Sequence, residues 1–260
     1  GFTTPSNGQQ LTATVTLPVL TVGEPTVGKD LQASAYVSLE TAAPAGGVMV
    51  TVTSANPAAV LLSTDPTVAG SASVMIWVPP GYPNVSFYVQ ALAGSGSSQV
   101  TAHAAGYADD TGTVTLAPSG FVLRSYLYYS PGGDFSTTTL SGNTALQVRS
   151  GPLDAFLNSA CLSNENYCQG LRPGLNANVT VTSSDTVVGT VTGVASFTGG
   201  GPYNAYTEFD PAQPGATTLA LQTPAGFTTP SNGQQLTATV TLPNLTLYSS
   251  TVGENLQTTA

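Results

Sequence analysis

Short segments in which apolar residues alternate with Thr, Ser or Gln occur throughout the 260-residue chain. Alternation with a period of two is typical of β-strands, because successive side chains point to opposite faces. Turn clusters such as APAGG, VPPGYPN and AGSGSS separate the segments. The pattern therefore predicts an all-β chain of antiparallel β-sandwiches. The expected strands include Gln10–Leu17, Val48–Ser54, Ser73–Val78, Ser86–Leu92, Thr111–Leu116 and Ala177–Ser183. Leu153–Leu162 has a weak helical pattern.

The first eighteen residues, Gly1–Pro18, return unchanged at Gly226–Pro243. The similarity continues without a gap, so that Gly1–Ala35 aligns with Gly226–Ala260. A period this long exceeds the 20–50 residues of solenoid repeats and points to whole domains as the repeating element. We expect Gly1–Pro18 to be the closing hairpin of a preceding domain.

A shorter similarity divides the long period in two. The segment VTVTSANP at Val50–Pro57 resembles VTVTSSDT at Val179–Thr186, and related turn-and-strand patterns follow each. We therefore predict a unit A at Val19–Gly120 and a unit B at Phe121–Pro243. Residues Asn244–Ala260 are then the opening strands of the next unit A, and the chain is one period of a tandem array with overlap.

The composition limits the partners of the chain. It has four cations (Lys29, Arg124, Arg149 and Arg172) against thirteen acids, and a net charge of -9. Nucleic acids and anionic lipids need clusters of Lys and Arg, so neither is an expected partner. The longest apolar runs fall short of a membrane span. Low charge weakens repulsion between copies, which favours self-association.

The two cysteines, Cys161 and Cys168, lie in the segment CLSNENYC. We expect a local disulfide, which fits an oxidising compartment. A reduced pair of buried thiols is the alternative. The surrounding segment, Leu153–Arg172, is the one candidate for a specialised function in unit B.

The sequence gives no reason to expect an enzyme, a cofactor or a bound metal. The single histidine, His103, falls on the solvent face of a strand, and no nucleophile elbow is present. Asp109, Asp110 and Glu24 are calcium-ligand types, but Ser249 replaces Glu24 in the repeat. Turn formation explains the paired aspartates more simply.

A cluster of aromatic residues, Tyr126, Tyr128 and Tyr129, follows the start of unit B. On a strand, Tyr126 and Tyr128 share one face, and Tyr129 lies on the other. Three interpretations remain open: packing between domains or chains, core packing, and stacking on a glycan. Trp77 is expected in the core or at the rim of its sandwich.

The runs VTVTSANPAAVLLS, AGSASVMIWVPPG and GYADDTGTVTL resemble bacterial immunoglobulin-like repeat domains. The resemblance implies tandem immunoglobulin-like β-sandwiches in a large secreted or surface-anchored protein, and hence an extracellular or cell-surface location. It implies a structural array, such as a fibre, stalk or surface layer. The alternative is an adhesin that binds a glycan or a protein. The insert around Cys161 and Cys168 departs from the short connection usual in such domains.

Overall fold

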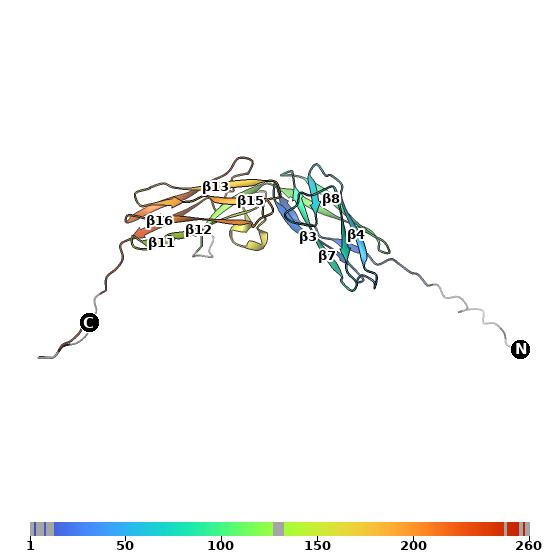
Figure 1. Ribbon diagram of the computed structural model, residues 1–260, viewed down its shortest axis with the longest axis horizontal. Helices are drawn as coiled ribbons and strands as arrows, with labels where there is room; N and C mark the ends of the chain where they lie inside the picture. The colour runs from blue at the N-terminus through green and yellow to red at the C-terminus, as the bar shows by residue number, and fades with distance from the viewer. Residues whose placement is uncertain are drawn as a thin grey trace. The chain divides into compact units, whose positions relative to one another are not determined.

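The computed structural model describes residues 3, 8, 13–126, 133–246, 249–254 and 257. The chain is all-β and divides into two compact units (Figure 1). Unit 1 consists of Gly1–Ser119 with two short later segments, Gln169–Leu175 and Thr198–Gly201. Unit 2 consists of Gly120–Cys168, Asn176–Phe197 and Pro202–Ala260.

Unit 1 has a four-stranded sheet in the order β1-β3-β7-β5 and a five-stranded sheet in the order β2-β9-β8-β4-β6. Side chains from both sheets form one apolar core, which includes Val37, Val50, Phe87 and Val100. The strands of unit 1 are β1 (Leu20–Val22), β2 (Thr26–Gly28), β3 (Gln32–Leu39), β4 (Val48–Ser54), β5 (Val60–Ser63), β6 (Ser73–Val78), β7 (Asn84–Ala91), β8 (Ser97–Ala104) and β9 (Asp110–Ala117).

Unit 2 repeats this arrangement with the orders β10-β12-β16-β14 and β11-β18-β17-β13-β15. The two units therefore share one topology: each strand of unit 1 has a counterpart in unit 2 at the same place in the corresponding sheet, so that β1 corresponds to β10 and β9 to β18. The strands of unit 2 are β10 (Ser119–Ser125), β11 (Phe135–Thr138), β12 (Thr144–Pro152), β13 (Asn176–Ser183), β14 (Gly189–Thr192), β15 (Ala195–Thr198), β16 (Asn204–Pro211), β17 (Gly215–Gln222) and β18 (Gln235–Thr241).

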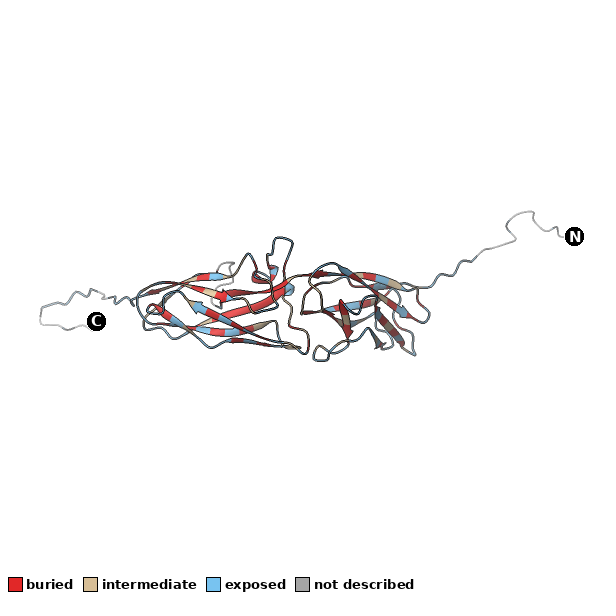
Figure 2. Ribbon diagram, turned by 90° about the horizontal axis from the view of Figure 1, so that it is seen from above, coloured by how far each residue is buried: buried red, intermediate tan, exposed pale blue. Residues whose placement is uncertain are grey.

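The alternating sequence pattern explains most of these strands. In β4, the valines at positions 48, 50 and 52 are buried, while Met49 and Thr53 face outward. Figure 2 shows the same alternation of buried and exposed residues along many strands. Burial of one face drives each sheet onto its partner, and the Thr-rich outer faces remain in water.

The expectation of purely antiparallel sheets needs a correction. Strand β2 runs parallel to β9, and β11 runs parallel to β18, while the other strand pairs among the described residues are antiparallel. In each unit the opening segment begins in the four-stranded sheet and continues in the five-stranded sheet. In unit 1 the change of sheet falls between Val22 and Thr26, where Pro25 lacks a backbone N–H. The opening segment thus pairs with the closing strand of its own unit.

Three local expectations are also corrected. The weak helical pattern at Leu153–Leu162 gives no α-helix. The segment has one 3₁₀ turn, at Ala160–Leu162, and a second 3₁₀ turn follows at Glu165–Tyr167. The strand expected at Gln10–Leu17 is not formed over its described part, Ala13–Leu17. The described residues between 244 and 257 contain no strand either. None of the described helical turns has the length and apolar character needed to cross a lipid bilayer.

Candidate functional site

The two copies of the eighteen-residue sequence occupy different environments. Val240 lies in β18 and is 2% exposed, whereas Val15, its counterpart in the other copy, is 93% exposed. All the described residues of Ala13–Leu17 are exposed. The position that Gly226–Pro243 fills in unit 2, which we call the closing-strand site, is therefore the candidate functional site.

Strand β18 lies between two neighbours in the five-stranded sheet. It pairs antiparallel with β17, where Gly215 is opposite Val240, and parallel with β11, where Phe135 is opposite Ala238. The inward side chains of Leu236, Ala238 and Val240 are buried in the core of unit 2. The strand thus has partners on both edges and a core beneath it.

The segment before β18 is fixed by the first strand of unit 2. The ring of Phe227 packs on Phe121, with 4.8 Å between the ring centroids. The carbonyl of Gly233 accepts a hydrogen bond from the backbone N–H of Leu123 at 2.7 Å. Gly233 has a φ of 66°, and a Cβ atom there would come within 2.9 Å of Val122. Both the backbone conformation and the packing therefore favour glycine at this position.

The insert that carries the cysteines holds the same segment from the other side. The side chain of Asn232 accepts a hydrogen bond from the Ser159 N–H at 2.9 Å and donates one to the Ser159 carbonyl at 3.3 Å. The Ser231 hydroxyl donates to the Phe156 carbonyl at 2.7 Å, and its N–H donates to the Leu157 carbonyl at 2.8 Å. The insert is thus part of the closing-strand site.

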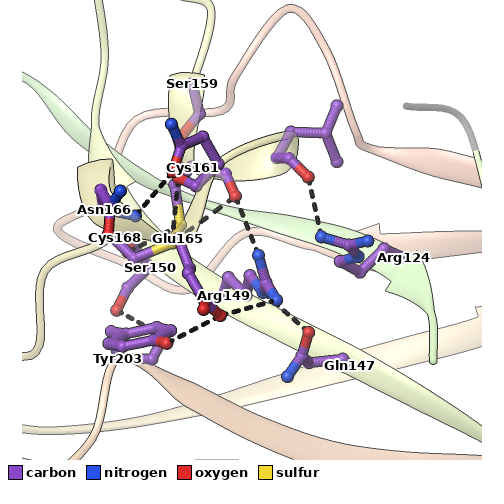
Figure 3. The surroundings of a disulfide bond; sticks show 12 residues. Arg124, Gln147, Arg149, Ser150, Ser159, Cys161, Glu165, Asn166, Cys168 and Tyr203 are labelled. Atoms are coloured by element: carbon purple, nitrogen blue, oxygen red, sulfur yellow. Dashed lines mark hydrogen bonds and ion pairs between the residues drawn. A yellow bond between two sulfur atoms is a disulfide. The ribbon is translucent and has the colours of Figure 1, made fainter. Parts of the chain in front are cut away.

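The expected disulfide between Cys161 and Cys168 is present in the insert. Beneath it lie two arginines, Arg124 of β10 and Arg149 of β12, which are only 4% and 6% exposed. Figure 3 shows both guanidinium groups directed toward the insert. Arg124 donates to the Leu162 carbonyl at 3.1 Å, and Arg149 donates to the Cys161 carbonyl at 3.5 Å. Two of the four cations of the chain therefore support the backbone of the insert.

Arg149 has further partners. Its Nε donates to Gln147 Oε1 at 2.7 Å, and its Nη2 lies 3.6 Å from Glu165 Oε2. The Tyr203 hydroxyl donates to the same Glu165 oxygen at 3.2 Å. Burial raises the pKa of Tyr203, and the neighbouring Glu165 carboxylate raises this pKa further. The phenol therefore stays protonated near neutral pH and remains a donor to Glu165.

A small pocket opens beside the two arginines. Its volume is about 210 Å³, and Ser163, Asn164 and Glu165 line it together with Arg124 and Arg149. The donors and acceptors around it are largely engaged with the insert itself. The chemistry of the pocket is therefore that of a structural support, which positions the insert against Asn232.

The aromatic cluster is described only in part. Tyr126 is 57% exposed, and its ring meets Tyr206 edge-on, with 5.8 Å between the centroids. The Tyr206 hydroxyl accepts a hydrogen bond from Gln147. Tyr128 and Tyr129 lie outside the described residues. Core packing is thus excluded for Tyr126, while packing between domains or chains and stacking on a glycan both stay open for this residue.

The outer face of unit 1 carries two of the residues considered from the sequence. His103 is exposed, as expected, and its Nδ1 lies 2.7 Å from Asp109 Oδ1. Trp77 does not pack in the core, because Ile76 and Val78 take the inward positions of β6. Its ring lies over Gly47, next to the start of β4, as the rim alternative predicted. Trp77 is half exposed and pairs across the strands with Met49.

Two of the three acidic residues considered as calcium ligands act as acceptors for backbone groups. Asp110 accepts a hydrogen bond from the Val22 N–H at 2.8 Å, and Glu24 accepts one from the Thr113 N–H at 2.9 Å. Both bonds hold the opening segment of unit 1 against β9. Among the described residues, no three His, Cys, Asp or Glu side chains lie close enough together to hold a metal ion.

Comparisons with known proteins give no family. No protein-family model matches the chain, and no curated protein sequence matches it. Among solved structures, domains 4 and 5 of the S-layer protein SbsC align over 74% of this chain and 75% of that chain, with 16% identity and a TM-score of 0.33. SbsC domains 4–9 align over 87% of this chain and 32% of that chain, with 17% identity and a TM-score of 0.29.

InvD from Yersinia pseudotuberculosis aligns over 90% of this chain and 60% of that chain, with 17% identity and a TM-score of 0.32. The chain thus spans less than two thirds of InvD and of SbsC domains 4–9. Likeness at this level establishes neither a shared fold nor a function.

Sequence reasoning identified the duplicated segment and the cysteines, but not the contacts between them. Neither the burial of Arg124 and Arg149 nor the role of Asn232 was expected. One signal was available for the arginines. In a chain with only four cations, Arg124 directly follows Leu123 and Arg149 directly follows Val148, whereas the alternating segments elsewhere in the chain carry mostly Thr or Ser beside their apolar residues.

Proposed function

We propose that the chain is a structural repeat of an extracellular tandem array, with immunoglobulin-like β-sandwiches as its units. The array would form a fibre, a stalk or a surface layer. The single observation that carries the proposal is the strand order, which is the same in unit 1 and unit 2 and places the closing strand, β9 or β18, at the same position in each. An extended assembly can be lengthened by adding such units, because each brings its own core.

Composition and covalent chemistry support this role. Charged residues make up only 7% of the chain, so few charged side chains stand where a further copy would pack. The disulfide between Cys161 and Cys168 fits an oxidising, extracellular compartment. We propose no catalytic activity for these units, and the partner that we propose is a further copy of the same kind of unit.

An electron micrograph of the native material tests this proposal. Each sandwich, with the loops at both of its ends, should extend on the order of 35–40 Å, because its longer strands have about 8–10 residues and rise about 3.3 Å per residue. End-to-end stacking of two units then predicts an axial repeat of roughly 70–80 Å. A sharp repeat near this length supports the array. A random distribution of angles between domains, with no axial repeat, would contradict it.

An adhesin is the second candidate, and one surface favours it. Met49, Met75 and Trp77 are all exposed on the outer face of β4 and β6. The related outer face of unit 2 carries Asn178, Thr180 and Ser196 instead. A half-exposed tryptophan is a suitable platform for a sugar ring.

Glycan-array binding of the chain and of Trp77→Ala tests the adhesin candidate. The binding role predicts a glycan signal that is lost in Trp77→Ala and kept in a control, Thr101→Ala, on the same sheet. Absence of glycan binding by both proteins would leave the structural role as the better proposal.

A further inference from the structure

We infer that the closing-strand site of unit 2 is a docking site for Gly1–Pro18 of a second copy of the chain, which replaces Gly226–Pro243 there. The inference rests on the proposed structural role and names the contact that joins the copies. Its basis is that one sequence occurs twice, once buried in a sheet and once with an exposed apolar face.

The side chains that enter the core are the same in both copies. Leu11, Ala13 and Val15 correspond to Leu236, Ala238 and Val240, and all three of the latter are buried in unit 2. Pairing with β11 and β17 uses backbone groups, which do not depend on side-chain identity. A second copy can therefore reproduce both the sheet pairing and the core packing of β18.

The duplicated segment also carries side chains that fit the insert. Asn232 pairs with both backbone groups of Ser159, and Ser231 bonds to Phe156. Their counterparts are Asn7 and Ser6. The equivalent connection of unit 1, between β3 and β4, is the short segment 40–47, whereas in unit 2 the residues 153–175 connect β12 and β13. Gly1–Pro18 thus has the residues required by a unit 2, although it precedes a unit 1.

The path out of the site is compatible with exchange. After Pro243 the chain continues with LTL and TVGENLQ, and after Pro18 it continues with LTV and TVGKDLQ at the same positions. A donor strand from a second copy would lead from the site into β1 of the donor's own unit 1. The docked pair is a head-to-tail contact that leaves one donor segment and one site open, so further copies can add to it and extend the assembly.

The two copies of the segment compete for one site, and each would make the same contacts there because their sequences are identical. The tethered Gly226–Pro243 has an effective concentration in the millimolar range and wins in dilute solution. The second copy enters when chains are crowded or when the tethered strand is disabled. Until then, Gly1–Pro18 presents Val15 and Leu17 to solvent, and this exposed, strand-forming sequence is free to add to the sheet of another chain.

The test disables one copy at a time in the full chain. Val240→Asp should expel β18 from the sheet of unit 2. The molar mass of this variant, measured by light scattering, should then rise with protein concentration, because Gly1–Pro18 of neighbouring chains fills the vacant sites. Val15→Asp alone should remain a monomer with a folded unit 2. The double variant Val15→Asp/Val240→Asp should also remain monomeric, since neither copy can enter the site.

A synthetic peptide with the sequence Gly1–Pro18 gives a second readout, which does not depend on assembly between chains. It should bind the double variant one to one and restore slow amide exchange in Gly215–Ala220 of β17. The same peptide with Val15→Asp should bind at least about 100-fold more weakly.

Three results would overturn the inference: a Val240→Asp chain that stays monomeric at all concentrations, equal assembly by the double variant, or no peptide binding. These outcomes leave the proposed array intact, because its axial repeat is measured separately on native material. Conversely, peptide binding together with the absence of an axial repeat would support the docking site and contradict the proposed array.

Discussion

Val240 and Val15 hold the same place in two copies of one eighteen-residue sequence, yet Val240 is buried in a sheet and Val15 is exposed. The local sequence is the same, so intrinsic strand propensity cannot account for the difference. The neighbours account for it: Val240 has β17 on one side and β11 on the other. Strand formation in this chain is decided by the available site and not by the segment alone.

The comparison extends to the polar residues beside the strand. Asn232 and Ser231 are held by the insert of unit 2, whose backbone is supported by the disulfide and by two buried arginines. The copy at Gly1–Pro18 carries the same polar residues, Asn7 and Ser6. Variants made at matched positions in the two copies therefore separate the contribution of the site from that of the sequence.

The largest expected effect comes from the core residue. Val240→Ala should destabilise unit 2 by about 2–3 kcal/mol, because it removes buried methyl groups and leaves a cavity. Val15→Ala should change the stability by less than about 0.5 kcal/mol, because Val15 is exposed. Calorimetry should show the loss in one transition only. Trp77, the only tryptophan and a residue of unit 1, identifies the other transition by its fluorescence.

Removal of the disulfide should have the next largest effect. Cys161→Ser/Cys168→Ser should cost unit 2 about 2.5 kcal/mol on the chain-entropy model for a short loop. The Trp77 signal of unit 1 should be unchanged. A loss shared equally by both units, or no loss at all, would contradict the view that the insert stabilises the closing-strand site of unit 2.

The amide that links the closing segment to the insert should matter less. Asn232→Ala should destabilise unit 2 by about 1–2 kcal/mol, because two hydrogen bonds to Ser159 are lost. Asn7→Ala, the matched change in the other copy, should leave both thermal transitions in place. Equal effects of the two variants would mean that Asn7 has a structural partner of its own.

The smallest effect concerns pH. The Asn158 backbone N–H lowers the pKa of Asp154 most, and the Phe156 N–H lowers it further. Because the folded-state pKa is depressed, the contribution of Asp154 is complete above the unfolded pKa, near 3.9. It is lost as the pH falls through the folded value. Asp154→Asn should remove this acid sensitivity from unit 2, as measured by melting temperature between pH 2 and 6, with Asp65→Asn in unit 1 as the control.

The sequence predicted much of the fold, because period-two alternation is local. The segments expected at Val48–Ser54 and Ser73–Val78 are β4 and β6 with the same bounds, and the one expected at Thr111–Leu116 lies within β9. The parallel pairing of β11 with β18 was not predicted, since it joins segments about a hundred residues apart. Such pairing depends on where the chain changes sheets, which alternation does not encode.

The candidate site was predicted in part. The duplicated segment and the cysteine pair are visible in the letters of the sequence. The burial of Arg124 could not be predicted. Arg124 directly follows the apolar Leu123, so its side chain points to the other face of the strand, which is typically the face in contact with solvent. The insert covers this face, and its Leu162 carbonyl, which is distant in sequence, accepts the hydrogen bond from Arg124. Sequence alternation cannot show which outer faces are covered by a distant loop.

Amide hydrogen exchange of the two copies in one wild-type sample tests the central claim most directly. Proteolytic fragments that run past Pro18 or Pro243 differ in mass, so Ala13–Leu17 and Ala238–Leu242 can be followed separately. In dilute solution the account predicts slow exchange for Ala238–Val240 and immediate exchange for Ala13–Leu17. Protection of Ala13–Leu17 should appear only as the protein is concentrated into assemblies. Equal protection of both copies in a dilute monomer would contradict the account, since Gly1–Pro18 would then have a site within its own chain.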